Sequence, residues 1–160
     1  MAQYGGFWRR VLAYIIDAII VNVAGSLVGF VVGLALGLQM QSGGADTETF
    51  EGAAGLAGGV LGLVSSWLYF AILESSSMQG TLGKKALGMI VTDLDGGRIG
   101  FGRATGRYFA KILSGIILLI GFIMVAFTER KQGLHDMIVG TLVFKASSSS
   151  ELNTSAAVFE

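Results

Sequence analysis

Two long apolar runs without Lys or Arg restrict the folds that this sequence can adopt. The first is Val11–Leu38, and the second extends from about Ala53 to Leu73. About 20 apolar residues are enough for a helix to cross the hydrocarbon core of a bilayer. In lipid, only helices and closed barrels satisfy every backbone polar group, so both runs predict transmembrane helices.

The composition supports a membrane protein and argues against a soluble catalytic domain. Only 14% of the 160 residues are charged, against about 25% in a typical soluble domain. The formal net charge is zero, which provides no field to attract nucleic acid. With no cysteine and one histidine, a zinc site is not expected. The sequence shows no nucleophile–base pair, so we expect neither an enzyme nor a cofactor.

The basic start of the chain, followed by an apolar run, also suggests a secretory signal peptide. The apolar part of a signal peptide has about 7–15 residues, and Val11–Leu38 extends far beyond that. The run also carries Asp17 near its start. We therefore expect it to remain in the protein as a membrane helix.

The distribution of Lys and Arg predicts the orientation of the two spans. Arg9 and Arg10 precede the first span, the loop Gln39–Glu51 has no Lys or Arg, and the connection Ser75–Arg107 has five. Basic residues are enriched in cytoplasmic loops. The N-terminus and the second connection are therefore expected in the cytoplasm, and the acidic loop is expected outside.

The third apolar stretch, Tyr108–Thr128, has two interpretations. It could cross the membrane once, or it could bend at Gly115 and Gly121 into a re-entrant helical hairpin. Two β-prone runs, Leu87–Asp93 and Ile138–Phe144, flank the stretch. If they pair, both ends of the stretch lie on one side. Basic residues also follow the stretch, so we favour the re-entrant form.

These features together predict an all-α integral membrane protein. It would contain two long transmembrane helices, a third hydrophobic helix or re-entrant helical hairpin, and a small cytoplasmic β-hairpin element. The sequence Asp95-Gly96-Gly97 is suited to the hairpin turn. The membrane domain is expected to cover residues 5–145, and the serine-rich residues 146–160 are expected to form a disordered tail.

Glycine recurs at four-residue intervals along both spans. The positions are Gly25, Gly29, Gly33, Gly37, Gly55 and Gly59. Residues four apart share a helix face, and small residues there allow close helix packing. The first interpretation is that one span packs on the other within a monomer. The second is a contact between two copies in a homodimer.

Arg10, Tyr14 and Asp17 lie on one face at the start of the first span. A carboxylate in the middle of a membrane costs about 2.5–3.5 kcal/mol, so Asp17 needs a cation, water or a proton. An ion pair between Arg10 and Asp17, or with a base elsewhere, is the structural interpretation. A cation or proton site at Asp17 is the functional one.

Three further ionisable residues are candidates for binding ions or protons. Glu74 ends the second span, where we interpret it as a solvated boundary charge. His135 stands beside Asp136, and such a pair usually ties down a turn, although histidine also serves in proton relays. Asp136 would approach the basic start of the first span if the C-terminal segment folds back.

Arg103, Arg107 and Lys111 recur every four residues before the third apolar stretch. Aromatic residues lie among them. A basic, aromatic helix start of this kind is suited to the membrane interface. We expect these three side chains to contact anionic lipid headgroups.

Four segments resemble the RDD family of bacterial membrane proteins. They are GFWRRVLAYIID (Gly6–Asp17), TLGKKALGMIVTDLDGGRIGF (Thr81–Phe101), GRYFAKILS (Gly106–Ser114) and KQGLHDMIVGTLVF (Lys131–Phe144). The family is named for one arginine and two aspartates. By motif match these fall on Arg10, Asp17 and Asp136. The resemblance implies a small multi-helix domain in the bacterial cell inner membrane.

A sodium/proton antiport activity is ascribed to some relatives in this family. The resemblance therefore implies a secondary transporter that exchanges a monovalent cation such as sodium for protons. Asp17 and Asp136 would be the titrating carboxylates, and Arg10 would compete with the cation. Three short apolar stretches make a thin pathway, so a homodimer belongs to this hypothesis. The alternative is a non-transporting membrane scaffold or assembly factor, in which the same residues are structural.

Overall fold

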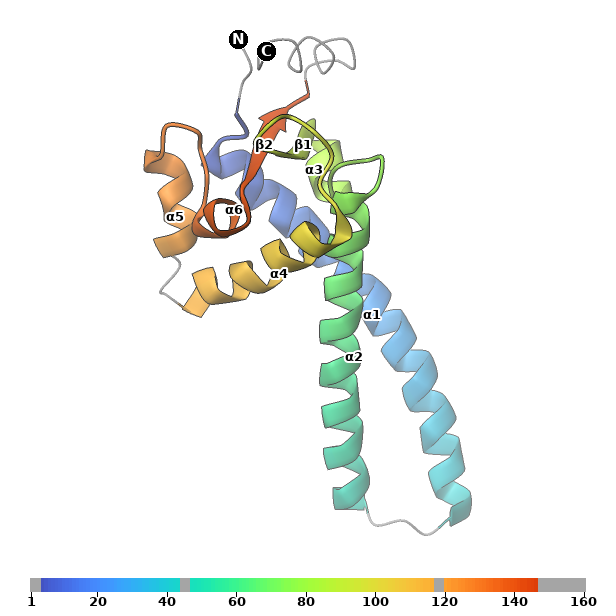
Figure 1. Cartoon of the computed structure of the whole chain (residues 1–160). Helices are drawn as coiled ribbons and strands as arrows, with labels where there is room; N and C mark the ends of the chain where they lie inside the picture. Colours follow the sequence, from blue (N-terminus) through green and yellow to red (C-terminus); the bar gives the residue numbers. More distant parts are fainter. Residues whose placement is uncertain (1–3, 44–46, 117–119, 147–160) are drawn as a thin grey trace. The chain divides into compact units, whose positions relative to one another are not determined.

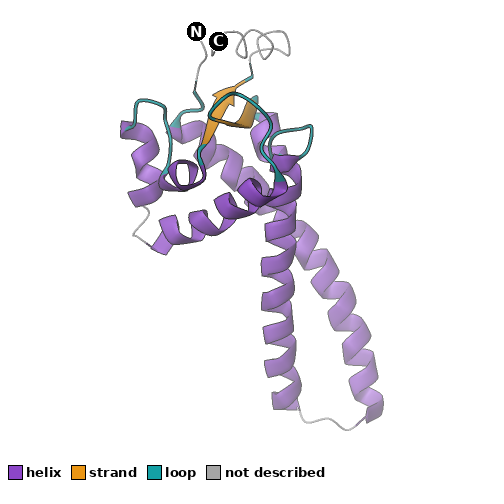
Figure 2. Ribbon diagram, viewed as in Figure 1, coloured by secondary structure: helices purple, strands orange, loops and turns teal. Residues whose placement is uncertain are grey.

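A computed structural model describes residues 4–43, 47–116 and 120–146 of the chain (Figure 1). The structure is mostly helical, with one small sheet (Figure 2). The chain divides into two compact units. One unit comprises Met1–Asp17 together with Tyr69–Glu160, and the other comprises Ala18–Leu68.

Two long helices account for the two predicted spans. Helix α1 covers Phe7–Gly43 and helix α2 covers Thr47–Ser75. Within them, Phe7–Leu38 and Ala54–Ser75 are long and apolar enough to cross a membrane. The predicted loop Gln39–Glu51 is mostly helical instead. Glu48 lies in the first turn of α2, where a negative charge is favourable beside the helix N-terminus.

The unit Ala18–Leu68 presents apolar side chains outward. Phe30 is 70% exposed and Leu56 is 76% exposed. At all six glycines of the predicted stripes, an added Cβ atom would meet no heavy atom within 4 Å. The expectation that the glycines seat one span on the other within the chain was therefore wrong for the part of the chain that the structure describes.

The other unit contains six short elements in addition to the ends of α1 and α2. They are α3 (Leu82–Ala86), β1 (Met89–Asp93), α4 (Phe101–Ile116), α5 (Ile120–Phe127), α6 (Leu134–Val139) and β2 (Thr141–Lys145). Helix α4 packs against α6, and α5 contacts both helices. Helices α4 and α6 carry several of the ionisable residues of the site described below.

The two β-prone runs supply the strands of one antiparallel sheet, except that Ile138 and Val139 of the second run belong to α6. Its register pairs Met89 with Lys145 and Asp93 with Thr141. Tyr4 forms a bridge to Phe144, so the N-terminal segment joins the same sheet. The pairing of β1 with β2 confirms the small antiparallel element, but its strands come from distant parts of the chain. A single bridge, between Thr92 and Arg98, closes over the predicted hairpin turn.

The third apolar stretch is divided between two helices. Helix α4 ends at Ile116 and α5 begins at Ile120. Because β1 precedes α4 and β2 follows α5, the chain returns to the sheet from which it departed (Figure 1). The predicted tail, residues 146–160, lies outside the described residues except for Ala146.

Candidate functional site

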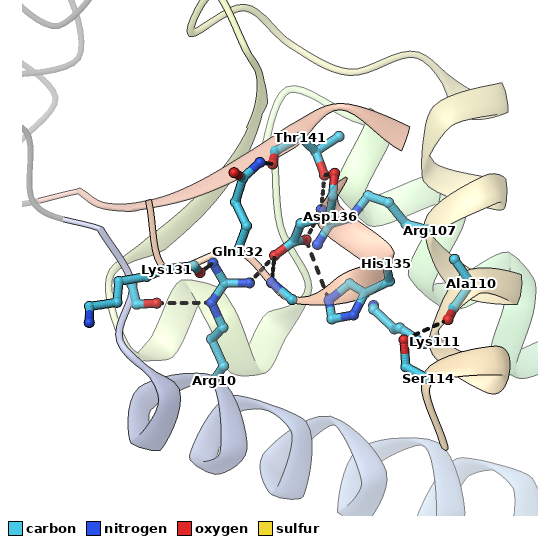
Figure 3. A network of polar contacts seen from close by, with 12 residues as sticks. Arg10, Arg107, Ala110, Lys111, Ser114, Lys131, Gln132, His135, Asp136 and Thr141 are labelled. Atoms are coloured by element: carbon cyan, nitrogen blue, oxygen red, sulfur yellow. Dashed lines mark hydrogen bonds and ion pairs between the residues drawn. The ribbon is translucent and has the colours of Figure 1, made fainter. Parts of the chain in front are cut away.

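All three guanidinium nitrogens of Arg10, in α1, donate hydrogen bonds, and two of them reach the C-terminal part of the chain. Its Nη1 donates to Asp136 Oδ2, its Nε donates to Gly5 O at 2.9 Å, and its Nη2 donates to Lys131 O at 2.6 Å (Figure 3). Side chains on a helix lean toward its N-terminus, away from Asp17 two turns later. The predicted Arg10–Asp17 pair was therefore wrong. Asp136, expected near the start of the first span if the C-terminal segment folds back, is the residue that pairs with Arg10.

Asp136 lies between two guanidinium groups at the start of α6 (Figure 3). Besides Arg10, it accepts a hydrogen bond at 2.5 Å from Arg107 Nη1 and one at 3.2 Å from the backbone N–H of Gly133. Burial raises the pKa of the Asp136 carboxyl, but the charges of Arg107 and Arg10 outweigh burial and hold that pKa well below its usual range. Asp136 therefore stays ionised at neutral pH.

Arg107 of α4 connects Asp136 to a second carboxylate. Its side chain is 1% exposed, and its Nε donates to Glu74 Oε2 at 2.9 Å. Its Nη1 also donates to Thr141 of β2. Burial lowers the pKa of Arg107, but Asp136 and Glu74 outweigh burial, and the net effect is a raised pKa. The predicted headgroup contact was wrong for Arg107, because the side chain is enclosed by protein.

Glu74, one residue before the end of α2, is a buried acceptor for three bases. Lys84 Nζ donates to Oε1, and Lys111 Nζ lies 3.2 Å from the same oxygen. Arg107 occupies Oε2. The interpretation of Glu74 as a solvated boundary charge was therefore wrong, since its residue exposure is 0%. Several groups of opposite charge make this burial tolerable, because they replace the water that a carboxylate loses.

Lys111 points inward rather than toward headgroups. Its Nζ lies 4.7 Å from the ring centroid of Phe70, in addition to its contact with Glu74. Burial lowers the pKa of Lys111 to about 8, against the opposing attraction of Glu74. Of the three residues predicted to bind headgroups, Arg103 is the one whose side chain is largely exposed, at 53%, and it lies 3.7 Å from Asp93.

The Asp17 carboxylate accepts its hydrogen bonds from uncharged groups rather than from Lys or Arg. Its Oδ1 accepts from Tyr69 Oη and from the backbone N–H of Gly83, both at 2.8 Å, and its Oδ2 accepts from Thr81 Oγ1 at 2.5 Å. Thr81 is the N-cap of α3. The carboxylate therefore lies at the N-terminal end of α3, where negative charge is favourable. None of the ion pairs among the described residues includes Asp17.

Gly83 allows α3 to approach α1 closely enough for this contact. A Cβ atom at Gly83 would lie 2.2 Å from Ala13 O and 2.9 Å from Asp17 Cγ. No side chain fits at that distance. The glycine therefore brings the N–H of α3 within reach of the Asp17 carboxylate.

His135 is buried beside Asp136, with 3.4 Å between its Nε2 and Asp136 Oδ1. Its Nδ1 has no hydrogen-bond partner in the described structure. Burial lowers the pKa of His135 to about 3, despite the attraction of Asp136, so the ring is neutral at physiological pH. Among the residues that the structure describes, no three His, Asp or Glu side chains are grouped as a metal site requires.

We call the connected ion pairs the charge network. It contains four bases and two acids, and its members are Arg10, Lys84, Arg107, Lys111, Glu74 and Asp136. They join the ends of α1 and α2 to α3, α4 and α6. Sequence reasoning missed Lys84, Tyr69 and Thr81. Of these, Thr81 had a detectable signal, because threonine is favoured at a helix N-cap.

Comparison with known proteins gives one family and two relatives. Residues 4–140 match the sequence profile of the RDD family. The chain is 44% identical to the uncharacterized protein YxaI of Bacillus subtilis (strain 168) over 149 residues, which cover 89% of this chain and 98% of that protein. It is 32% identical to the uncharacterized membrane protein YteJ of the same organism over 146 residues, which cover 88% and 80%. No solved structure matches the chain.

Proposed function

The chain belongs to the RDD family of membrane proteins, and from this premise we propose that it is a non-transporting membrane scaffold or assembly factor. In this role the charge network and the Asp17 contacts hold the short elements at the ends of the two membrane helices. The arginine and the two aspartates of the family motif are then structural ties.

One observation carries this proposal: protein donors fill every carboxylate oxygen of the site. Glu74 and Asp136 accept from Lys and Arg side chains at all four oxygens. Both oxygens of Asp17 accept hydrogen bonds from protein groups. A cation entering here would have to displace a buried base, and breaking a buried ion pair leaves an uncompensated charge that costs about 3–5 kcal/mol.

Asp17 supports a second candidate, the exchange of a monovalent cation such as sodium for protons. Its carboxylate is buried, with 1% exposure, and it is held by uncharged donors. The hydroxyl oxygens of Tyr69 and Thr81 could turn their lone pairs toward a cation beside Asp17. A homodimer belongs to this candidate, and the open space at the glycines of both spans leaves room for a second copy.

Flux and stability measured together separate the two candidates. The protein is reconstituted in liposomes with an internal pH dye, and sodium is added outside. The scaffold proposal expects no dye response from wild type. It also expects Asp17→Asn to lower the Tm in detergent, because the neutral amide weakens the contacts with Tyr69, Thr81 and Gly83.

Asp95→Asn is the matched control, because it removes an exposed carboxylate from a turn. It should leave the Tm near that of wild type. A sodium-dependent dye response that Asp17→Asn abolishes, with the Tm unchanged, would overturn the scaffold proposal and support exchange at Asp17.

A further inference from the structure

Helix α4 has the reverse of the pattern that a helix shows on a soluble protein. Its buried residues are Ala104, Arg107, Ala110 and Ser114, which share one face. Other positions of the helix carry exposed apolar side chains, among them Ile112, Leu113 and Ile116. A helix in water turns its apolar face inward. Here a charged and small-residue face is inside, and the apolar face is outside.

The neighbouring helix α6 repeats this pattern, and α5 also exposes an apolar side chain. Phe127 of α5 is 82% exposed, and Met137 and Ile138 of α6 are also exposed. The inward residues of α6 are His135 and Asp136, both buried. Helices α4 and α6 therefore enclose charge, α5 buries the apolar Val125, and all three expose apolar surface, which in a soluble protein marks an interaction surface.

The charge network fixes the level of these helices along the membrane spans. Arg107 and Lys111 of α4 bind Glu74, which lies one residue from the end of the span Ala54–Ser75. Asp136 of α6 binds Arg10, close to the start of the span Phe7–Leu38. Helices α4 and α6 are thus tied to the end of α1 that carries Arg10 and the end of α2 that carries Glu74.

The distribution of charge along α4 indicates how it meets the membrane. Arg103, near its start, is largely exposed, whereas Ile112, Leu113 and Ile116 occupy its second half. The 16 residues of α4 extend about 24 Å at ~1.5 Å per residue, which is shorter than a hydrocarbon core of about 30 Å. The basic start is complementary to anionic headgroups, and the apolar half is complementary to acyl chains.

We propose that α4, α5 and α6 insert their exposed apolar face into a single leaflet of the bilayer, at the end of the spans that carries Glu74 and Arg10. The partner of this surface is the acyl chains of that leaflet. The helices do not cross the membrane. This inference holds for either function considered above, because it depends on the exposed apolar residues and on the ion pairs that fix their level.

Spin labels on single cysteines measure the depth of this surface in lipid nanodiscs. The chain has no native cysteine, so Leu113→Cys and Ile138→Cys can each carry one label. Both positions are exposed, and the label should not disturb the fold. Asp95→Cys provides a reference in water, and Val28→Cys, in the first span, provides a deep one. Circular dichroism and size-exclusion profiles identify variants that fold as wild type.

The proposal expects labels at Leu113→Cys and Ile138→Cys to collide more with oxygen than with a water-soluble nickel reagent. Their depth should lie between those of the two references. Three results would overturn it: nickel accessibility equal to that of Asp95→Cys, protection from both reagents as in a contact with protein or a second copy, or a depth equal to that of Val28→Cys.

Discussion

Arg107 is the residue shared by the two acids of the charge network. Its four-residue spacing with Arg103 and Lys111 in the sequence predicts headgroup binding. The spacing correctly places the residues on a helix, but it cannot tell which side of that helix faces protein. The buried partners Glu74 and Asp136 decide that question.

We expect Arg107→Gln to destabilise the protein by about 3–5 kcal/mol, because it leaves two buried carboxylates with fewer partners. The measurement is a large fall in Tm in detergent. Arg103→Gln is the matched control and should change stability by at most about 1 kcal/mol, since its pair with Asp93 is exposed. Equal effects of the two substitutions would contradict the central position of Arg107.

His135 should make the fold sensitive to acid. Its pKa is about 3 when folded and about 6.5 when unfolded, so between these values the unfolded chain binds the extra proton. The buried, neutral His135 ring therefore gives its full contribution to folding stability above pH 6.5. This contribution is lost as the pH falls toward 3, because protonation favours the unfolded chain. Thermal melts from pH 7 to pH 4 should show a falling Tm, and the fall should be smaller in His135→Gln. A steeper fall in the variant would contradict this assignment.

Among the secondary-structure elements, α3 depends most on a close backbone contact, which brings Gly83 against Ala13 of α1. Gly83→Ala should lower the Tm strongly, because the added methyl group collides with the backbone at Ala13 and separates Asp17 from α3. Gly102→Ala in α4 is the control, since nothing lies within 4 Å of the added atom. Alanine there should be neutral or should stabilise the helix by up to about 1 kcal/mol. Tolerance of Gly83→Ala would mean that α3 does not seat on α1.

Sequence reasoning located the elements better than it located their partners. Hydropathy and length identify α1 and α2 because a continuous apolar run is a local signal, and β-propensity identified both strands of the sheet. The partner of Arg10 is different. Asp136 lies 126 positions away, and the sequence places it near Arg10 only on the condition that the C-terminal segment folds back, whereas the nearer carboxylate, Asp17, satisfied the same local rule. Burial of Glu74 was likewise invisible, because it requires bases from α3 and α4.

For the whole molecule, the basic residues predict that the unit holding the charge network is cytoplasmic. In intact cells, a membrane-impermeant thiol reagent should label Glu48→Cys, in the connection that is expected outside, and should leave Lys85→Cys unlabelled until the cells are opened. Both positions are exposed, and the chain has no native cysteine. The reverse labelling pattern would show the opposite orientation.

The separation between Arg10 and Asp136 also has a consequence for biosynthesis. Ribosomes add about 5–20 residues per second, so roughly 6–25 s pass between the synthesis of these two partners. During that interval the first helix must wait with an uncompensated guanidinium group, held by water or by lipid phosphate. A nascent chain that stalls before α6 would expose this unmet charge, which would distinguish an unfinished product from a finished one.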